Sequence, residues 1–281
     1  MLKTNPDRHS ALDFVVLVDD YRRFYQGLAT RRELHRPVFL MTGMASLLPP
    51  NVIAFAPDEG RRGIAKCLVV DSAHFEHALG DRPRDHFLLG RMVQRVGVVW
   101  TRDPEDEVWA TSLLRAAHDG VLGWMAPYLE GTFDAADLGR RLLEVCYRGE
   151  LRPESKGRSA AIFEAQADHF GTVLQPGIDR ALDSGLVVPE GEGVRLAAPA
   201  DSASSRYWRR HFRRSKARAT LRWFKHMFTF ANWLPYVVRK VERHTGRTIR
   251  LTLLERKLPL LFLWPRAIHV LLTRPKKELR S

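Results

Sequence analysis

Residues 11–19 read ALDFVVLVD, an apolar and β-branched run that Asp13 interrupts near its start. A run of this composition predicts a strand buried on both faces or nearly so. Residues 20–30 change to helical spacing, and 51–56 and 64–70 predict two further strands. The next elements that we predict are helices at 72–79 and 84–95 and a strand at 96–100. Interleaved strands and helices suggest an α/β or α+β domain here. We predict the α+β class, with a mixed sheet in a domain over residues 1–105.

Beyond Asp106 the apolar spacing is helical. We predict helices at 107–129, 135–147, 159–174 and 176–184. The segment LVVPEGEGVRLA, residues 186–197, then predicts a hairpin that turns at 190–193. Helices followed by a hairpin predict a helical or winged-helix domain over residues 106–198, with a polar linker after it.

Charge is unevenly distributed along the chain. The net charge is +13, and residues 206–281 hold 21 Lys or Arg against 3 acids, or +18, which leaves −5 for the first 205 residues. A basic segment of this kind predicts an anionic partner, either anionic lipid or nucleic acid. Its apolar run at 258–272 is shorter than the roughly 20 residues that span a bilayer.

Aromatic residues are interleaved with this basic charge, a pattern typical of segments that bind at a membrane surface. We therefore predict that 206–281 is a basic, helical, membrane-associating region. The candidate membrane residues are Trp208, Trp223, Phe224, Phe228, Trp233 and Trp264. Two other interpretations stay open, namely nucleic-acid binding, which we rank lower, and a plain helical domain with a basic face. The two cysteines, Cys67 and Cys146, argue against a disulfide framework.

Asp13 is the first candidate for a metal ligand. A carboxylate inside an apolar strand is costly to bury unless it is paired or binds a metal, and carboxylate oxygens suit Mg²⁺. The alternative is an Asp at a strand end on the surface. Asp71, at the end of another predicted strand, is the second candidate ligand, and its alternative role is to cap the helix after it.

Several short motifs occur in a consistent order. Residues 12–35, LDFVVLVDDYRRFYQGLATRRELH, resemble the opening of the mitochondrial-type phosphatidate cytidylyltransferases, the translocator assembly and maintenance family. GIAKCLVV at 63–70 and FLLGRM at 87–92 are similar to its lysine-bearing strand and its Gly-Arg helix. YRGELRPESKGR at 147–158 is similar to the Tyr-x-Gly-Asp-hydrophobic-Arg segment of that family. The resemblance covers about residues 11–180.

The resemblance implies a nucleotidyltransferase fold that converts CTP and phosphatidic acid to CDP-diacylglycerol and pyrophosphate with Mg²⁺. It implies a peripheral location at the cytoplasmic face of a bacterial inner membrane, or alternatively the matrix face of the mitochondrial inner membrane. Asp13 would hold the metal, and Lys66 would neutralise the triphosphate. The implied phosphate-binding residues are His35, Arg91, Arg152 and Lys156.

One departure from the family concerns its Gly-Ser loop, which precedes the strand Asp. Here 12 residues precede Asp13, and MLKTNPDRHSAL contains no glycine. We expect either a reading frame that starts further upstream or a catalytically silent relative. A basic winged-helix protein that binds nucleic acid remains the alternative from a different class.

Overall fold

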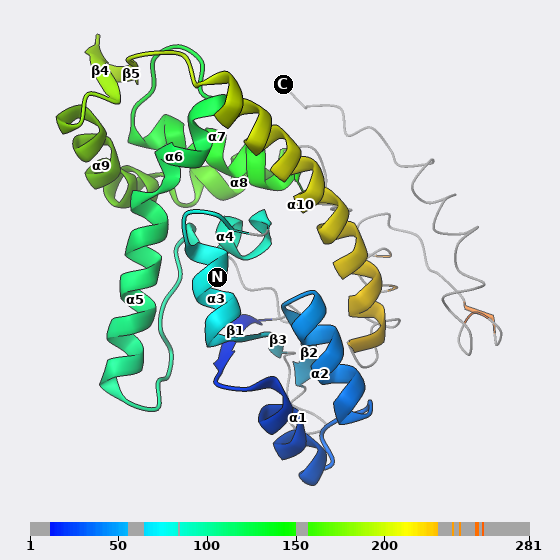
Figure 1. Cartoon of the computed structure of the whole chain (residues 1–281). Helices are drawn as coiled ribbons and strands as arrows, with labels where there is room; N and C mark the ends of the chain where they lie inside the picture. The colour runs from blue at the N-terminus through cyan, green and yellow to red at the C-terminus, as the bar shows by residue number, and fades with distance from the viewer. Residues whose placement is uncertain are drawn as a thin grey trace. The chain divides into compact units, whose positions relative to one another are not determined.

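The chain folds as an α+β protein in the computed structural model shown in Figure 1. The structure describes residues 12–55, 65–83, 85–149 and 157–229, together with five single positions beyond them. Its contacts divide the chain into one unit over Met1–Thr229 and another over Phe230–Ser281. Among the described residues, no helix is both long enough and apolar enough to cross a bilayer.

A three-stranded mixed sheet forms the first layer. Its strands are β1 (Leu12–Val18), β2 (Asn51–Phe55) and β3 (Ala65–Asp71), in the order β1-β3-β2. β1 runs parallel to β3, whereas β2 runs antiparallel to it. The three strands predicted within 11–70 are therefore confirmed, and β3 is the central strand of the described sheet.

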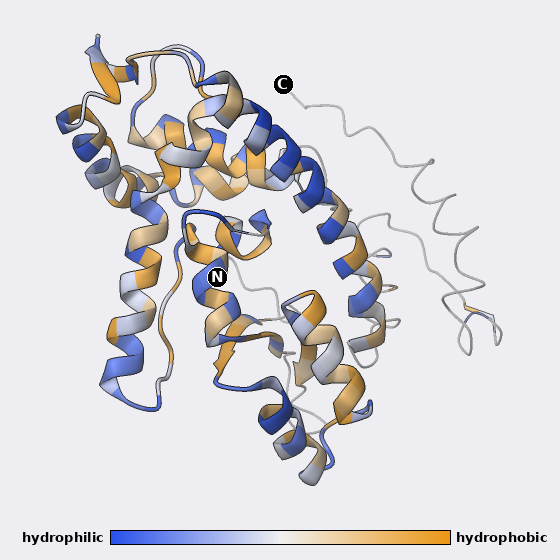
Figure 2. Ribbon diagram, in the orientation of Figure 1, coloured by the Kyte–Doolittle hydropathy of each residue, from blue (hydrophilic) through white to orange (hydrophobic). Residues whose placement is uncertain are grey.

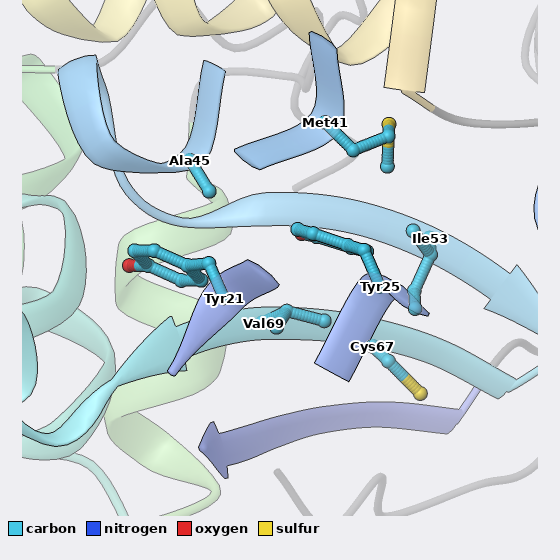
Figure 3. Packing of buried hydrophobic residues seen from close by; sticks show 7 residues of the cluster. All are labelled: Tyr21, Tyr25, Met41, Ala45, Ile53, Cys67 and Val69. Atoms are coloured by element: carbon cyan, nitrogen blue, oxygen red, sulfur yellow. The ribbon is translucent and has the colours of Figure 1, made fainter. Parts of the chain in front are cut away.

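Two helices cover one face of this sheet. α1 (Tyr21–Thr30) and α2 (Val38–Leu47) pack on alternate residues of the strands. Figure 3 shows this core, in which Tyr25, Cys67 and Val69 are buried together with four neighbours. The Asn51 amide donates to the Tyr25 hydroxyl and to the Met41 carbonyl, both at 2.8 Å, and thereby fixes α1 and α2 to the start of β2.

A predicted strand at 96–100 is absent, so this expectation was wrong. The segment runs without regular structure between α4 and α5, and Val99 and Trp100 are 79% and 81% exposed. A strand requires a hydrogen-bonded neighbour, and no described strand pairs with these residues. Local β-propensity therefore did not decide the structure of this segment.

The helical part begins directly after the sheet. Its helices are α3 (Ser72–Leu79), α4 (His86–Met92), α5 (Pro104–Asp119), α6 (Val121–Met125), η1 (Ala126–Tyr128), α7 (Ala135–Arg148), α8 (Arg158–Glu164) and α9 (Ala167–Asp183). An aspartate caps the start of α3, α4, α5 and α7 in turn, as short acceptor side chains do at helix N-termini. α9 continues through Pro176, where the sequence had predicted two helices.

A hairpin closes the helical part. β4 (Val187–Glu190) and β5 (Gly193–Leu196) pair antiparallel, as predicted, and Val194 also bridges to Phe133. From Phe133 onward the order is therefore bridge residue, the three helices α7, α8 and α9, and hairpin. The helices α7 and α9 approach closely, because a Cβ on Gly139 would lie 2.6 Å from Phe170.

The helix α10 (Ser202–Thr229) belongs to the first unit rather than to a separate tail. Trp208 packs on Trp124 with ring centroids 6.3 Å apart, and Ser215 accepts a hydrogen bond from the His86 amide at 2.9 Å. Further along, α10 contacts β2 and the end of α2. One continuous helix thus contacts both the helical part and the sheet layer.

Candidate functional site

Asp13 and Lys66 lie side by side on neighbouring strands. They are partners in the parallel register of β1 and β3, and the Lys66 Nζ lies 3.8 Å from the Asp13 Oδ1. Each side chain is about one-third exposed, at 35% and 34%. Both lie on the face opposite the α1–α2 core, because the core uses the alternate residues Phe14 and Cys67. The predicted pair is therefore brought together.

The ring of Phe87 on α4 gathers three basic groups. The guanidinium of Arg91 lies 3.7 Å from the ring centroid, and that of Arg222 from α10 lies 4.3 Å from it. The imidazole of His226, also from α10, meets the same ring edge-on at 6.2 Å. A cation above an aromatic face is attracted by the ring quadrupole, so Phe87 positions these groups without neutralising them.

His226 joins the Phe87 group to the sheet. Burial, followed by the nearby charges of Lys225, Lys66, Arg222 and Arg91, holds the pKa of His226 well below its usual value. The imidazole is therefore neutral near pH 7. Its Nε2 is buried and has no hydrogen-bond partner among the described residues. Lys66 and Arg91, from distant motifs, are both among the charges that lower this pKa. Arg91 also shares the Phe87 ring with His226.

Asp85 is the carboxylate that pairs with the arginines of α10. Its Oδ2 accepts from the Arg218 Nε at 2.8 Å and from the Arg222 Nη2 at 2.7 Å. Burial alone would raise the pKa of Asp85, but the two guanidinium charges more than offset burial and leave that pKa below its usual value. Arg222 is 1% exposed and also donates to the Pro49 carbonyl at 2.9 Å. Its Nη1 is buried without a partner in the described part of the chain.

Lys225 lies one turn beyond Arg222 and caps the end of α2. Its ammonium donates to the carbonyls of Met44 at 3.3 Å and Pro50 at 2.7 Å, and also to that of Leu48. Burial, together with the charges of Arg222 and Arg218, lowers the pKa of Lys225 to about 6. With Lys225 left aside, four basic side chains face two carboxylates. The basic side chains are Lys66, Arg91, Arg218 and Arg222, and the carboxylates are those of Asp13 and Asp85. We call this set, with Phe87 and His226, the basic cluster.

Asp71 does not join Asp13. Its side chain accepts from the His74 backbone amide and contacts the His74 ring, both at 2.7 Å, and so caps α3. It also lies five residues from Lys66 along β3, roughly 17 Å at 3.3 Å per residue. One metal ion cannot bind both carboxylates. The prediction that Asp13 and Asp71 are ligands of the same metal ion was therefore wrong. Within the described ranges, no three His, Cys, Asp or Glu side chains gather as a metal-binding group.

The other predicted phosphate-binding residues divide into two groups. His35 is exposed in the segment between α1 and α2, where the neighbouring Arg36 donates to the Phe228 carbonyl at 3.2 Å. This places His35 beside the end of α10. Arg152 and Lys156 lie outside the described residues.

The predicted membrane residues also differ in their placement. Trp208 is 6% exposed and lies in the packing between α6 and α10, so it is a core residue of this unit. Trp223 and Phe228 are 43% and 46% exposed, and Phe224 is half-buried against the Trp223 ring at 5.4 Å. Trp233 and Trp264 lie outside the described residues.

Sequence reasoning missed the contribution of α10 to this site. The helix carries no acid. Its inner face bears Ser215, Arg218, Arg222, Lys225 and Thr229, spaced by three or four residues, and all of these except the partly exposed Arg218 are buried. A polar stripe with helical spacing was thus visible in the sequence. It was not recognised because the apolar residues Leu221 and Phe228, which normally mark the buried face, are exposed instead.

A cavity of about 410 Å³ lies apart from this site, among α5, α6, α9 and α10. Its lining includes Trp124, Trp208 and the ion pair of Asp119 with Arg180. None of the residues of the basic cluster lines it. The basic cluster and this cavity are therefore different places.

Comparisons with known proteins do not assign a family. No protein-family model matches the chain, and no curated protein shows significant similarity to it. The geometry of Asp13, Lys66 and the basic cluster is therefore the basis for any functional argument.

Proposed function

We propose that this chain is a phosphatidate cytidylyltransferase-like protein, which joins CTP and phosphatidic acid to give CDP-diacylglycerol and pyrophosphate. The observation that carries the proposal is the pairing of Asp13 with Lys66, whose charged atoms lie 3.8 Å apart on one face of the sheet. The charge of Lys66 also contributes to the lowered pKa of His226. A carboxylate beside an excess of basic side chains suits a triphosphate and the cation that accompanies it.

Lys66, Arg91 and the Arg222 Nη1 are the groups that would bind the phosphate oxygens. Neutralising these oxygens lowers the repulsion that an attacking anion meets, which is the main protein contribution in phosphoryl transfer. His226 is neutral near pH 7, so its buried Nε2 could donate or accept one hydrogen bond without adding charge. In the absence of substrate, Asp13 offsets part of the charge of Lys66.

The reaction itself needs little general-base help. A phosphate oxygen of phosphatidic acid, already ionised near neutral pH, attacks the α-phosphorus of CTP. A new bond between that oxygen and the α-phosphorus forms as the bond from the α-phosphorus to the bridging oxygen breaks, and pyrophosphate leaves with that electron pair. The role of the protein is therefore to position two anions and offset their charge.

Mg²⁺ fits this arrangement with Asp13 as its protein ligand. Magnesium is commonly held by one or two carboxylates plus substrate phosphates, so a single carboxylate beside a triphosphate site is sufficient. When bound, Mg²⁺ would withdraw charge from the transferring phosphoryl group. The Asp13 carboxylate would orient the nucleotide through that ion.

The remaining parts of the proposal concern architecture and location. The order of Phe133 bridge, α7, α8, α9 and hairpin supports a winged-helix assignment for the second part of the chain. The basic charge supports a peripheral location at an anionic membrane, such as the cytoplasmic face of a bacterial inner membrane or the mitochondrial matrix face.

Transfer of labelled CTP into lipid tests the proposal. Asp13→Ala should lower the rate by about 10²-fold or more, because it removes the proposed metal ligand. Lys66→Met should lower it by a similar factor. The measurement is incorporation of label into CDP-diacylglycerol by the full chain, with phosphatidic acid and Mg²⁺ supplied.

Asp19→Ala is the matched control. Asp19 follows the same strand but pairs with Arg102 on the surface at 2.8 Å, with its side chain 69% exposed. It should leave the rate within about twofold, as surface substitutions usually do. Retained transfer in Asp13→Ala would remove that residue from the site. The absence of transfer in the unaltered chain, including one extended upstream, would favour the catalytically silent alternative.

A further inference from the structure

The helix α2 exposes an apolar face. Its sequence, VFLMTGMASL, contains no charged residue, yet only Met41 and Ala45 of its ten residues are buried. Phe39 and Leu47 are 78% and 79% exposed. Gly43 lies between them on the same face, with nothing within 4 Å of the position that its Cβ would take. Figure 2 shows this apolar helix beside the more polar α1.

The end of α10 adds to this face. Leu221 and Phe228 are 60% and 46% exposed, and Trp223 is exposed as well. Two contacts join α10 to α2. Lys225 caps the end of α2, and Arg36, just before α2, donates to the Phe228 carbonyl. We define the α2–α10 surface as the exposed apolar residues of these two helices. They are Phe39, Leu40, Leu47, Leu221, Trp223 and Phe228.

Exposed cations accompany this surface. Before α2 the exposed charged residues are Arg31, Arg32 and Arg36, with Glu33 the one exposed acid of that segment. Along α10, six cations are exposed and no acid is present. They are Arg206, Arg209, Arg210, Arg213, Arg214 and Lys216. Helices that carry exposed apolar side chains together with an excess of exposed cations are typical of proteins that lie on anionic bilayers.

We propose that the α2–α10 surface docks on an anionic phospholipid bilayer, with Phe39 and Leu47 entering the headgroup region. This deepens the proposed function, on which it rests for its biological purpose, because the lipid substrate remains in the bilayer. Nucleic acid fits less well, since phosphates would use the arginines but leave the aliphatic residues of α2 in water. The docking element is thus a helix of the sheet layer, together with α10.

Vesicle flotation of the full chain tests this proposal. The probes are phosphatidylcholine vesicles with and without phosphatidic acid. Phe39→Ser combined with Leu47→Ser should lower binding to the phosphatidic acid vesicles by about tenfold or more, because two large side chains no longer leave water. Arg213→Gln combined with Arg214→Gln should also lower it, and only at low ionic strength.

The control is Val99→Ser combined with Trp100→Ser, which removes equally exposed apolar side chains before α5. It should float like the unaltered chain, and circular dichroism melts should agree for all variants. Equal flotation of the α2 variant and the unaltered chain would overturn the proposal. A loss of flotation in the control variant as large as that in the α2 variant would overturn it too. So would light scattering without vesicles that shows a dimer of the unaltered chain and none of the α2 variant.

A soluble short-chain phosphatidic acid separates this proposal from the catalytic one. With that substrate the α2 variant should transfer label at the unaltered rate, whereas Asp13→Ala should not. Loss of flotation with retained transfer would thus support the docking surface independently of any failure at Asp13.

Discussion

At the scale of single residues, Arg222 is unusual because a guanidinium is almost fully buried. It is held by Asp85, by the Pro49 carbonyl and by the Phe87 ring. Such a cation is costly to bury, and removing one partner leaves it uncompensated. The Asp85–Arg222 pair is therefore expected to matter more for stability than any surface ion pair of this chain.

Asp85→Asn is expected to lower the free energy of unfolding by about 3–5 kcal/mol. Asparagine keeps the size of the side chain and its capping of α4, so the lost charge is the main change. Denaturant unfolding measures the effect, with Asp19→Asn as the exposed control at about 0–1 kcal/mol. A cost for Asp85→Asn no larger than that of the control would contradict the argument.

The same pair predicts a pH dependence. The folded pKa of Asp85 is lowered below an unfolded value of about 3.9, so its stabilising contribution is complete above that value. It is lost as pH falls through the folded pKa. The difference in unfolding free energy between the unaltered chain and Asp85→Asn should therefore shrink only in acid, whereas a constant difference down to the acid limit would count against it.

The sequence predicted some of these residues and not others. Asp13 was recognised because it interrupts an apolar strand, and Lys66 because it matches the lysine of the family that the sequence resembles. The parallel register then aligns the two residues. Arg222 and His226 were not recognised, because the nearby apolar residues Leu221 and Phe228 would normally mark the buried face of this helix, and they are exposed instead. Their positions depend on a contact between segments more than 130 residues apart.

At the scale of elements, several helices followed from apolar spacing, and the sequence indicated Asp71 as a possible cap of α3. α2 was not predicted, because a short apolar run without a capping residue has the composition of a buried strand or a loop as much as of a helix. The strand predicted at 96–100 failed for the opposite reason, since its β-propensity was strong but none of the described strands pairs with it.

The packing of α7 on α9 gives a prediction at this scale. Gly139→Ala places a methyl group 2.6 Å from Phe170, so overpacking of about 1–3 kcal/mol should exceed the gain in helix propensity. Gly171→Ala is the matched control within α9, where nothing lies within 4 Å. Thermal melts should show a lower Tm for the first variant and an unchanged or higher Tm for the second, and the reverse order would refute this account of the packing.

At the scale of the whole molecule, the unit boundary after Thr229 differs from the linker that the sequence indicated at 197–205. A small polar segment there marks the start of α10, not the end of a folded unit, since Asp201 accepts from the amides of Ala203 and Ser204. Composition signals a change of segment, but only the contacts of α10 show that it belongs to the unit before it.

This boundary predicts the result of truncation. A chain ending at Thr229 should unfold in one cooperative transition, because it keeps every contact of α10 described here. A chain ending at Ala200 loses the partners of Asp85 and the cap of α2, and should melt at a much lower temperature. Calorimetry and circular dichroism of the two chains provide the comparison, and equal melting temperatures would show that α10 is dispensable.

The distance between Asp85 and Arg222 along the chain also affects biosynthesis. The two partners are separated by 137 residues, which a ribosome adds in roughly 7–30 s. Throughout that interval the nascent chain presents Asp85 to water without its cation, and the residues that α10 covers await that helix. Closure of the first unit is therefore a late event in translation, and pausing near residue 200 would prolong exposure to chaperones and proteases.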